Sequence, residues 1–157
     1  MDFNQGGVKM RYGILIFLFT AIIQTTAFSQ GATLDGLVVV GNKTGLSSVS
    51  RKQLNGIFRG SQSIWKTNEQ VTVVMPSSKA EYSEQFAGAV LQMSHAALQK
   101  YWLALVFQGR ANPPIFLNSS LEIVDYIKKN PGSIGVVKLS EREVPAALLI
   151  SISDRQK

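Results

Sequence analysis

The stretch Val71-Thr-Val-Val-Met-Pro-Ser-Ser-Lys-Ala-Glu81 places a short run of β-branched and apolar side chains directly before a helix-start signature. Such a run is typical of a strand buried on both faces. Pro76 ends the expected strand, because proline cannot donate a backbone hydrogen bond. Ser78 and Glu81 have the spacing of a capping box, so a helix is expected to begin there, with Tyr82 among its inward-facing residues. The segment predicts a strand followed by a helix.

The same alternation continues along the rest of the chain. Further strands are expected at residues 36–41, 134–137 and 147–152. Serines with capping signatures open three more expected helices, at Ser50, Ser94 and Ser119. The last of these helices ends at Lys129, and a turn at residues 130–132 follows it. The pattern predicts an α/β fold with one mostly parallel sheet flanked by helices.

Composition bounds the chemistry. The chain has 157 residues, 45% of them hydrophobic, which suits one domain with one core. It has no cysteine and one histidine, His95, so disulfides, thiolate metal sites and a nucleophilic cysteine are excluded, and no cofactor is expected. His95 stands at a helix start, where we expect a surface or capping role. The net charge of +6 favours an anionic partner, which could be a small oxyanion, a nucleic acid or a lipid surface.

The first residues resemble an export signal. A short basic region precedes the apolar run from Ile14 to Ile23, and small residues follow at Ala27 and Ser29. We therefore expect residues 1–29 to be a cleaved signal peptide and residues 30–157 to form the domain. The alternative is a membrane anchor, but the apolar run is shorter than the ~20 residues that a spanning helix needs. A periplasmic or secreted location follows, and it argues against nucleic acid as the partner.

Four segments, in order, resemble one protein family. They are a strand ending in Gly-Asn-Lys43, a short helix with Ile-Phe-Arg-Gly60 and the nearby Trp65, a stretch from Tyr101-Trp102 to Pro113-Pro114, and the turn and strand Asn130-Pro-Gly-Ser-Ile-Gly-Val-Val137. The family is the phosphate-type substrate-binding proteins of ABC importers, in their short, roughly half-length form. The resemblance implies a single lobe of a type II periplasmic-binding-protein fold. It also implies binding of phosphate or a similar small oxyanion, without catalysis, for ABC-type transport.

The sequence departs from the family in the segments that grip the anion. Full-length members enclose the anion between two lobes and open with a Gly/Ser-rich segment, which residues 30–40 lack. The family's anion-binding turn has an arginine and a Gly-Ser-Gly-Thr motif, whereas this chain has Met75 to Glu81 in its place. Val136 stands where the family has a tyrosine. A single lobe could pair with an ABC permease or with a second copy of itself.

The candidate ligand-binding residues lie in two places. Ser77, Ser78 and Lys79 supply hydroxyls, a helix start and a cation, which together suit an oxyanion. The alternative is a plain capping box, and Glu81 favours it because a carboxylate repels an anion. Thr44 and Ser48 are secondary candidates, since ligands of parallel sheets gather beyond the carboxyl ends of the strands. A polar turn is the alternative for this pair.

No combination of residues predicts an enzyme. There is no Gly-x-Ser-x-Gly elbow around a serine nucleophile, and Tyr101 and Trp102 have the spacing of core residues. The sequence thus leaves two hypotheses open. One is an exported oxyanion-binding protein, and the other is a secreted interaction module that keeps the lobe fold without a ligand. An exposed apolar patch would favour the second hypothesis.

Overall fold

The computed structural model describes residues 34, 36–140 and 143–153. The predicted signal peptide, residues 1–29, lies outside the described residues. The elements, in chain order, are β1 (Val38–Gly41), β2 (Ser48–Val49), α1 (Arg51–Phe58), β3 (Thr72–Pro76), α2 (Ser83–Phe86), the π-helix η1 (Ala87–Leu91), α3 (His95–Phe107), β4 (Ile115–Leu117), α4 (Ser120–Lys129), β5 (Ser133–Val137), the 3-10 turn η3 (Ala146–Leu148) and β6 (Leu149–Ile152).

The strands form one mixed sheet in the order β2-β6-β1-β5-β3-β4. Three of the five pairings are parallel: β3 with β5, β3 with β4, and β2 with β6. The strand β1 runs antiparallel to both of its neighbours, β5 and β6. The α/β class and the sheet flanked by helices are confirmed. The short strands β2 and β4 were not predicted, because two or three residues carry no readable periodicity.

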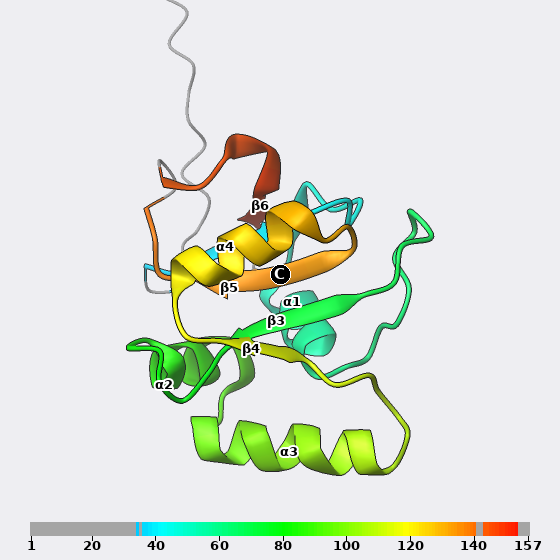
Figure 1. Cartoon of the computed structure of the whole chain (residues 1–157). Coiled ribbons are helices and arrows are strands. Elements are labelled where there is room, and N and C mark those ends of the chain that lie inside the picture. The colour runs from blue at the N-terminus through cyan, green and yellow to red at the C-terminus, as the bar shows by residue number, and fades with distance from the viewer. Residues whose placement is uncertain (1–33, 35, 141–142, 154–157) are drawn as a thin grey trace, which may run out of the picture.

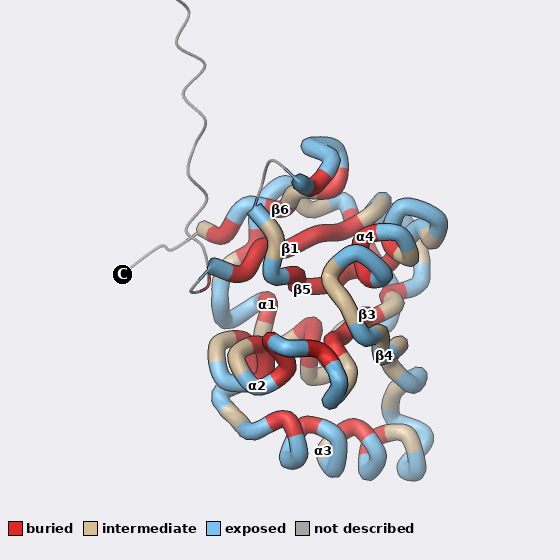
Figure 2. The backbone as a smooth tube through the Cα atoms, turned by 60° about the vertical axis from the view of Figure 1, so that its left-hand side comes forward, coloured by how far each residue is buried: buried red, intermediate tan, exposed pale blue. Residues whose placement is uncertain are grey.

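Helices cover both faces of the sheet (Figure 1). The helix α4 lies across one face and buries Ile123, Val124 and Ile127. The helix α1 lies behind the sheet in this view and buries Leu54, Ile57 and Phe58. Every residue of β1 and β5 is buried, and Figure 2 shows these strands as the buried centre of the molecule. The continuous apolar runs in the sequence correctly predicted strands enclosed on both faces.

Three of the four predicted serine caps are confirmed. The side chains of Ser50, Ser94 and Ser119 each accept a hydrogen bond from a backbone N–H in the first turn of their helix. The fourth, the capping box at Ser78, is wrong, since the helix begins only at Ser83.

The neighbouring serine accounts for the missing cap. The Ser77 hydroxyl accepts from the Lys79 N–H at 3.2 Å and donates to Asn118 Oδ1 at 2.6 Å. The Ser77 carbonyl accepts from the N–H of Ala80 at 3.0 Å, and Ala80 is buried. The contact with Asn118, 41 positions away, thus holds the chain after β3 in a turn, and the helix begins further along the chain.

His95 corrects another expectation. It is the first residue of α3, but it is buried rather than exposed. Its Nε2 lies 3.1 Å from the carbonyl oxygen of Pro76, and because a carbonyl can only accept, Nε2 carries the proton in this contact. The backbone N–H of His95 donates to the Glu84 carboxylate at 3.1 Å. His95 therefore fixes the start of α3 to the end of β3.

The segments that carry the family resemblance meet in the fold. The indole N–H of Trp65 donates to the Gly132 carbonyl at 2.7 Å, and the Gly132 N–H donates to the Asn42 carbonyl at 2.7 Å. The Tyr101 hydroxyl donates to the Arg59 carbonyl at 2.9 Å. These are buried or half-buried contacts that hold strands, turns and helices together. The resembling residues therefore serve the fold rather than an open ligand site.

Candidate functional site

The carboxyl ends of β3, β4 and β5 lie at one edge of the sheet, because the three strands are parallel. We call this the carboxyl edge and define it by the residues that follow each strand: Ser77, Asn118 and Lys138. The Ser77–Asn118 hydrogen bond joins the first two segments, and the Lys138 N–H donates to Ser120 Oγ at 3.0 Å to join the third to α4. Ligands of parallel sheets bind at such edges.

An open pocket of about 420 Å³ lies at this edge. Its walls come from the turn after β3, the start of α4 and the end of β5. The lining residues are Lys79, Glu81, Tyr82, Asn118, Ser119, Ser120, Leu121 and Lys138. The lining carries two ammonium groups against one carboxylate. The pocket also adjoins the first turn of α4, where backbone N–H groups have no partner within the helix.

Tyr82 forms the buried floor of this pocket. Its hydroxyl donates to the Val136 carbonyl at 3.3 Å. Burial raises the pKa of the Tyr82 hydroxyl, and a hydrogen bond with Ser120 partly offsets this rise. Tyr82 is therefore a neutral hydroxyl at physiological pH, and it adds no negative charge to the pocket.

The predicted ligand residues lie in separate parts of the sheet. Ser77, Ser78 and Lys79 lie at the carboxyl edge, and the last two are exposed. Thr44 lies at the other end, because β1 is antiparallel to β5 and its carboxyl end points the opposite way, whereas Ser48 lies at the far side of the sheet, three strands from β5. Thr44 is buried and its hydroxyl accepts from the Leu46 N–H at 3.2 Å, while Ser48 belongs to β2. The five residues therefore do not form one site.

The sequence did not predict three lining residues: Lys138, Asn118 and Ser120. The helix cap at Ser119 was visible in the sequence, and so was the lysine directly after the strand 134–137. What was missing is β4, whose position beside β3 brings Asn118 next to Ser77. The parallel pairing of β5 with β3 was missing as well, and it brings Lys138 to the same edge.

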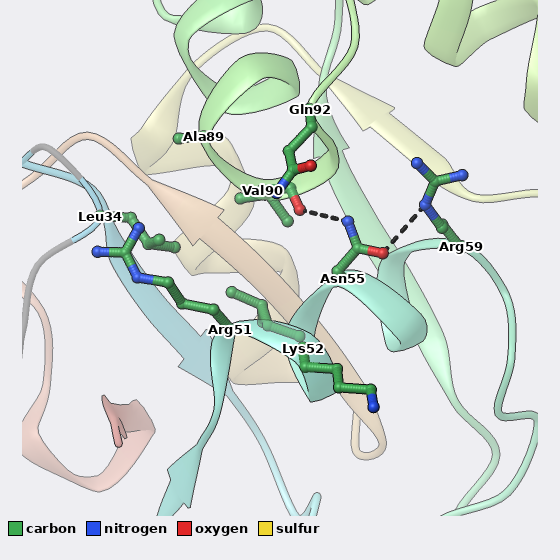
Figure 3. Close-up of a pocket in the computed structure, with 9 residues that line it drawn as sticks. Leu34, Arg51, Lys52, Asn55, Arg59, Ala89, Val90 and Gln92 are labelled. Carbon is green, nitrogen blue, oxygen red and sulfur yellow. Dashed lines mark hydrogen bonds between the residues drawn. The ribbon is translucent and has the colours of Figure 1, made fainter. Parts of the chain in front are cut away.

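A second pocket of about 420 Å³ lies between α1 and η1 (Figure 3). Arg51, Lys52 and Arg59 line it, and among the residues that the structure describes no acidic side chain does. Arg59 has a structural role: its Nε donates to Asn55 Oδ1 at 3.0 Å and its Nη2 donates to the Leu91 carbonyl at 3.0 Å. Asn55 in turn donates to the Val90 carbonyl at 2.8 Å, as the dashed lines in Figure 3 show. These bonds attach the end of η1 to α1.

Among the described residues, no three His, Cys, Asp or Glu side chains are grouped so that they could hold a metal ion. In the same part of the chain, no helix combines the length and hydropathy that crossing a membrane requires.

Known structures share this arrangement. Neither a protein-family model nor a curated protein matches the chain. PstS from Borrelia burgdorferi superposes with a TM-score of 0.57 at 14% identity, covering 78% of this chain and 49% of its own. The chain has the fold of a periplasmic-binding-protein-like lobe.

Two further phosphate-transport proteins superpose on it. One is a putative phosphate ABC transporter substrate-binding protein with bound phosphate from Clostridium perfringens, at a TM-score of 0.54 and 13% identity, covering 74% of this chain and 44% of its own. The other is an ABC-type phosphate transport receptor from Vibrio cholerae, at a TM-score of 0.48 and 18% identity, covering 77% and 47%. The chain spans about half the length of each of these proteins.

Proposed function

We propose that this protein is an exported solute-binding-like protein. It binds phosphate or a similar small oxyanion in the pocket at the carboxyl edge and does not catalyse a reaction. The observation that carries the proposal is that Lys79 and Lys138 both line the pocket at the start of α4. A helix start with nearby cations is the usual protein environment for an oxyanion. The fold shared with phosphate-binding transport proteins is consistent with this role. An ABC permease or a second copy of the chain would be the partner, outside the cytoplasm.

Of the predicted ligand-binding residues, the proposal keeps Lys79 in the pocket lining and adds Lys138 and the first turn of α4 from the fold. Ser77 and Ser78 belong to the adjoining turn after β3 and do not line the pocket. Thr44 takes no part, since it lies at the opposite end of the sheet, and neither does Ser48, which is three strands away from β5. The pocket is open on one side, so binding is expected to be weak for a single copy of the lobe.

Calorimetric titration of the full chain with inorganic phosphate tests the proposal, with sulfate and chloride compared at matched ionic strength. Replacing both lysines, Lys79→Gln with Lys138→Gln, is expected to weaken phosphate binding at least tenfold, because charge-assisted hydrogen bonds are lost. The matched control is Lys66→Gln with Lys129→Gln, which removes the same charge from exposed positions elsewhere. Equal losses in the two double variants would leave only a general charge effect and refute the site.

Glu81 offers a test in the opposite direction. Its carboxylate lines the same pocket and repels an anion. The variant Glu81→Gln is therefore expected to bind phosphate several-fold more tightly than the unchanged chain. If phosphate binds neither the unchanged chain nor the Glu81→Gln variant, the alternative function is the better one. That alternative is a secreted interaction module that keeps this fold without a ligand. Two observations favour it: Glu81 in the lining, and the exposed apolar side chains of Leu103 and Phe107 on α3.

A further inference from the structure

The helix α3 carries an apolar stripe on its outer face. Its inner face buries Leu98, Trp102 and Leu105. The outward-facing residues follow at intervals of four, three and four, and they are Ala96, Lys100, Leu103 and Phe107. Leu103 is 59% exposed and Phe107 is 82% exposed. A helix that is apolar on nearly all sides is normally covered on all sides, so this outer face lacks a partner.

The position of α3 limits what that partner can be. In both Figure 1 and Figure 2, α3 runs along the lower boundary of the molecule, and no other described element lies beyond it. The exposed side chains of its stripe therefore belong to a convex part of the surface rather than to a groove. A convex surface of this kind fits a deformable surface, whereas a folded protein would need a groove of matching shape.

The charges around the stripe favour an anionic surface. No acidic residue occurs between Glu84 and Glu122, and the two basic residues of that stretch are Lys100 and Arg110. Lys100 stands within the stripe, and Arg110 is exposed just after the helix. Two copies of the chain meeting through α3 would bring four cations into one interface, which opposes self-association. Anionic phospholipid headgroups complement both features of the stripe.

We propose that the outer face of α3 docks on a membrane surface that contains anionic phospholipids. Leu103 and Phe107 enter the interface between headgroups and acyl chains, and Lys100 and Arg110 contact headgroup phosphates. Apolar side chains flanked by cations bind membranes in this way. The proposal concerns a different surface from the Lys79–Lys138 pocket and does not depend on the proposed function.

A fluorescent probe at a single position tests the proposal on the full chain. The protein has no cysteine, so Leu103→Cys creates one labelling site for a dye whose emission rises in apolar surroundings. Ile64→Cys is the matched control, because Ile64 is 58% exposed and belongs to the loop between α1 and β3 rather than to α3. With vesicles of phosphatidylglycerol and phosphatidylcholine, emission is expected to rise several-fold at position 103 and to stay unchanged at position 64. A local readout separates this contact from vesicle binding through residues 14–23.

The contribution of the cations is tested on the labelled protein. Lys100→Gln with Arg110→Gln is expected to weaken vesicle binding about fivefold for each charge removed. The control Lys66→Gln with Lys129→Gln is expected to change it little. The proposal is overturned by no rise at position 103, by an equal rise at both positions, or by an equal rise with phosphatidylcholine alone. A rise that follows protein concentration without vesicles also overturns it and identifies a second copy as the occupant.

Discussion

Adding one methyl group at Gly132 is expected to destabilise the fold far more than adding it at Gly109. Both glycines have a positive φ, at 78° and 64°, so alanine at either position costs about 1 kcal/mol of backbone strain. At Gly109 a Cβ would meet nothing within 4 Å. At Gly132 it would lie 2.2 Å from the carbonyl oxygen of Gln70, so the backbone must move.

The additional cost at Gly132 follows from what that movement breaks. The Gly132 N–H donates to the Asn42 carbonyl, and the Gly132 carbonyl accepts from the Thr72 N–H at 3.0 Å and from the Trp65 indole at 2.7 Å. Losing two of these three buried hydrogen bonds costs about 2 kcal/mol. Gly132→Ala is therefore expected to lower the free energy of unfolding by about 3 kcal/mol, against about 1 kcal/mol for Gly109→Ala.

Urea unfolding followed by tryptophan fluorescence measures both values, since Trp65 is one of the groups whose surroundings change. The dependence of the free energy on urea should stay the same in both variants, which would show that the unfolded states are comparable. If the two variants lose the same stability to within about 0.5 kcal/mol, the close approach of Gly132 to Gln70 does not hold the turn as argued.

Three further expectations concern single side chains. Ser94→Ala removes a helix cap and should lower the free energy of unfolding by about 1 kcal/mol in thermal denaturation, whereas Ser78→Ala should change it by less than about 0.5 kcal/mol. Equal losses would show that Ser78 caps a helix after all. Trp65→Phe should cost about 1–2 kcal/mol in urea unfolding through the lost indole hydrogen bond and lost contacts, and a neutral result would contradict the contact with Gly132. Burial raises the Tyr82 pKa, so the folded state holds this proton longer than the unfolded state, and stability should fall as pH rises above ~10. Tyr82→Phe should lessen that fall, and an unchanged alkaline profile would exclude Tyr82 as its source.

Local signals in the sequence predicted the features that local chemistry determines. Ser50, Ser94 and Ser119 cap helices because each hydroxyl needs only a backbone N–H three residues ahead. Ser78 has the same signature and fails. A neighbouring serine is held by Asn118, 41 residues later, and this contact keeps the chain in a turn. Nothing near Ser78 in the sequence indicates that contact.

In the candidate site, too, local patterns predicted some residues correctly and missed those whose position depends on distant contacts. Ser77 and Lys79 were placed correctly at the end of a parallel strand. Thr44 and Ser48 were secondary candidates because the first strand was assumed to belong to a parallel sheet. The direction of β1 depends on its pairing with β5, which is more than ninety residues away in the chain, so local patterns carry no information about it. Lys138 was not predicted for a related reason, since its place at this edge depends on the parallel pairing of β5 with β3, which lie far apart in the chain.

The pairing of β1 has a consequence for how the protein is made. Both of its sheet partners, β5 and β6, are among the last elements to be synthesised. A nascent chain on the ribosome therefore holds an apolar strand with unpaired backbone groups until residues 133–152 have emerged. The sheet cannot close early, and long-range pairing of this kind slows folding. For a chain predicted to be exported, slow folding would keep the chain unfolded for translocation. It would also leave the apolar residues 38–41 exposed, as a substrate for chaperones.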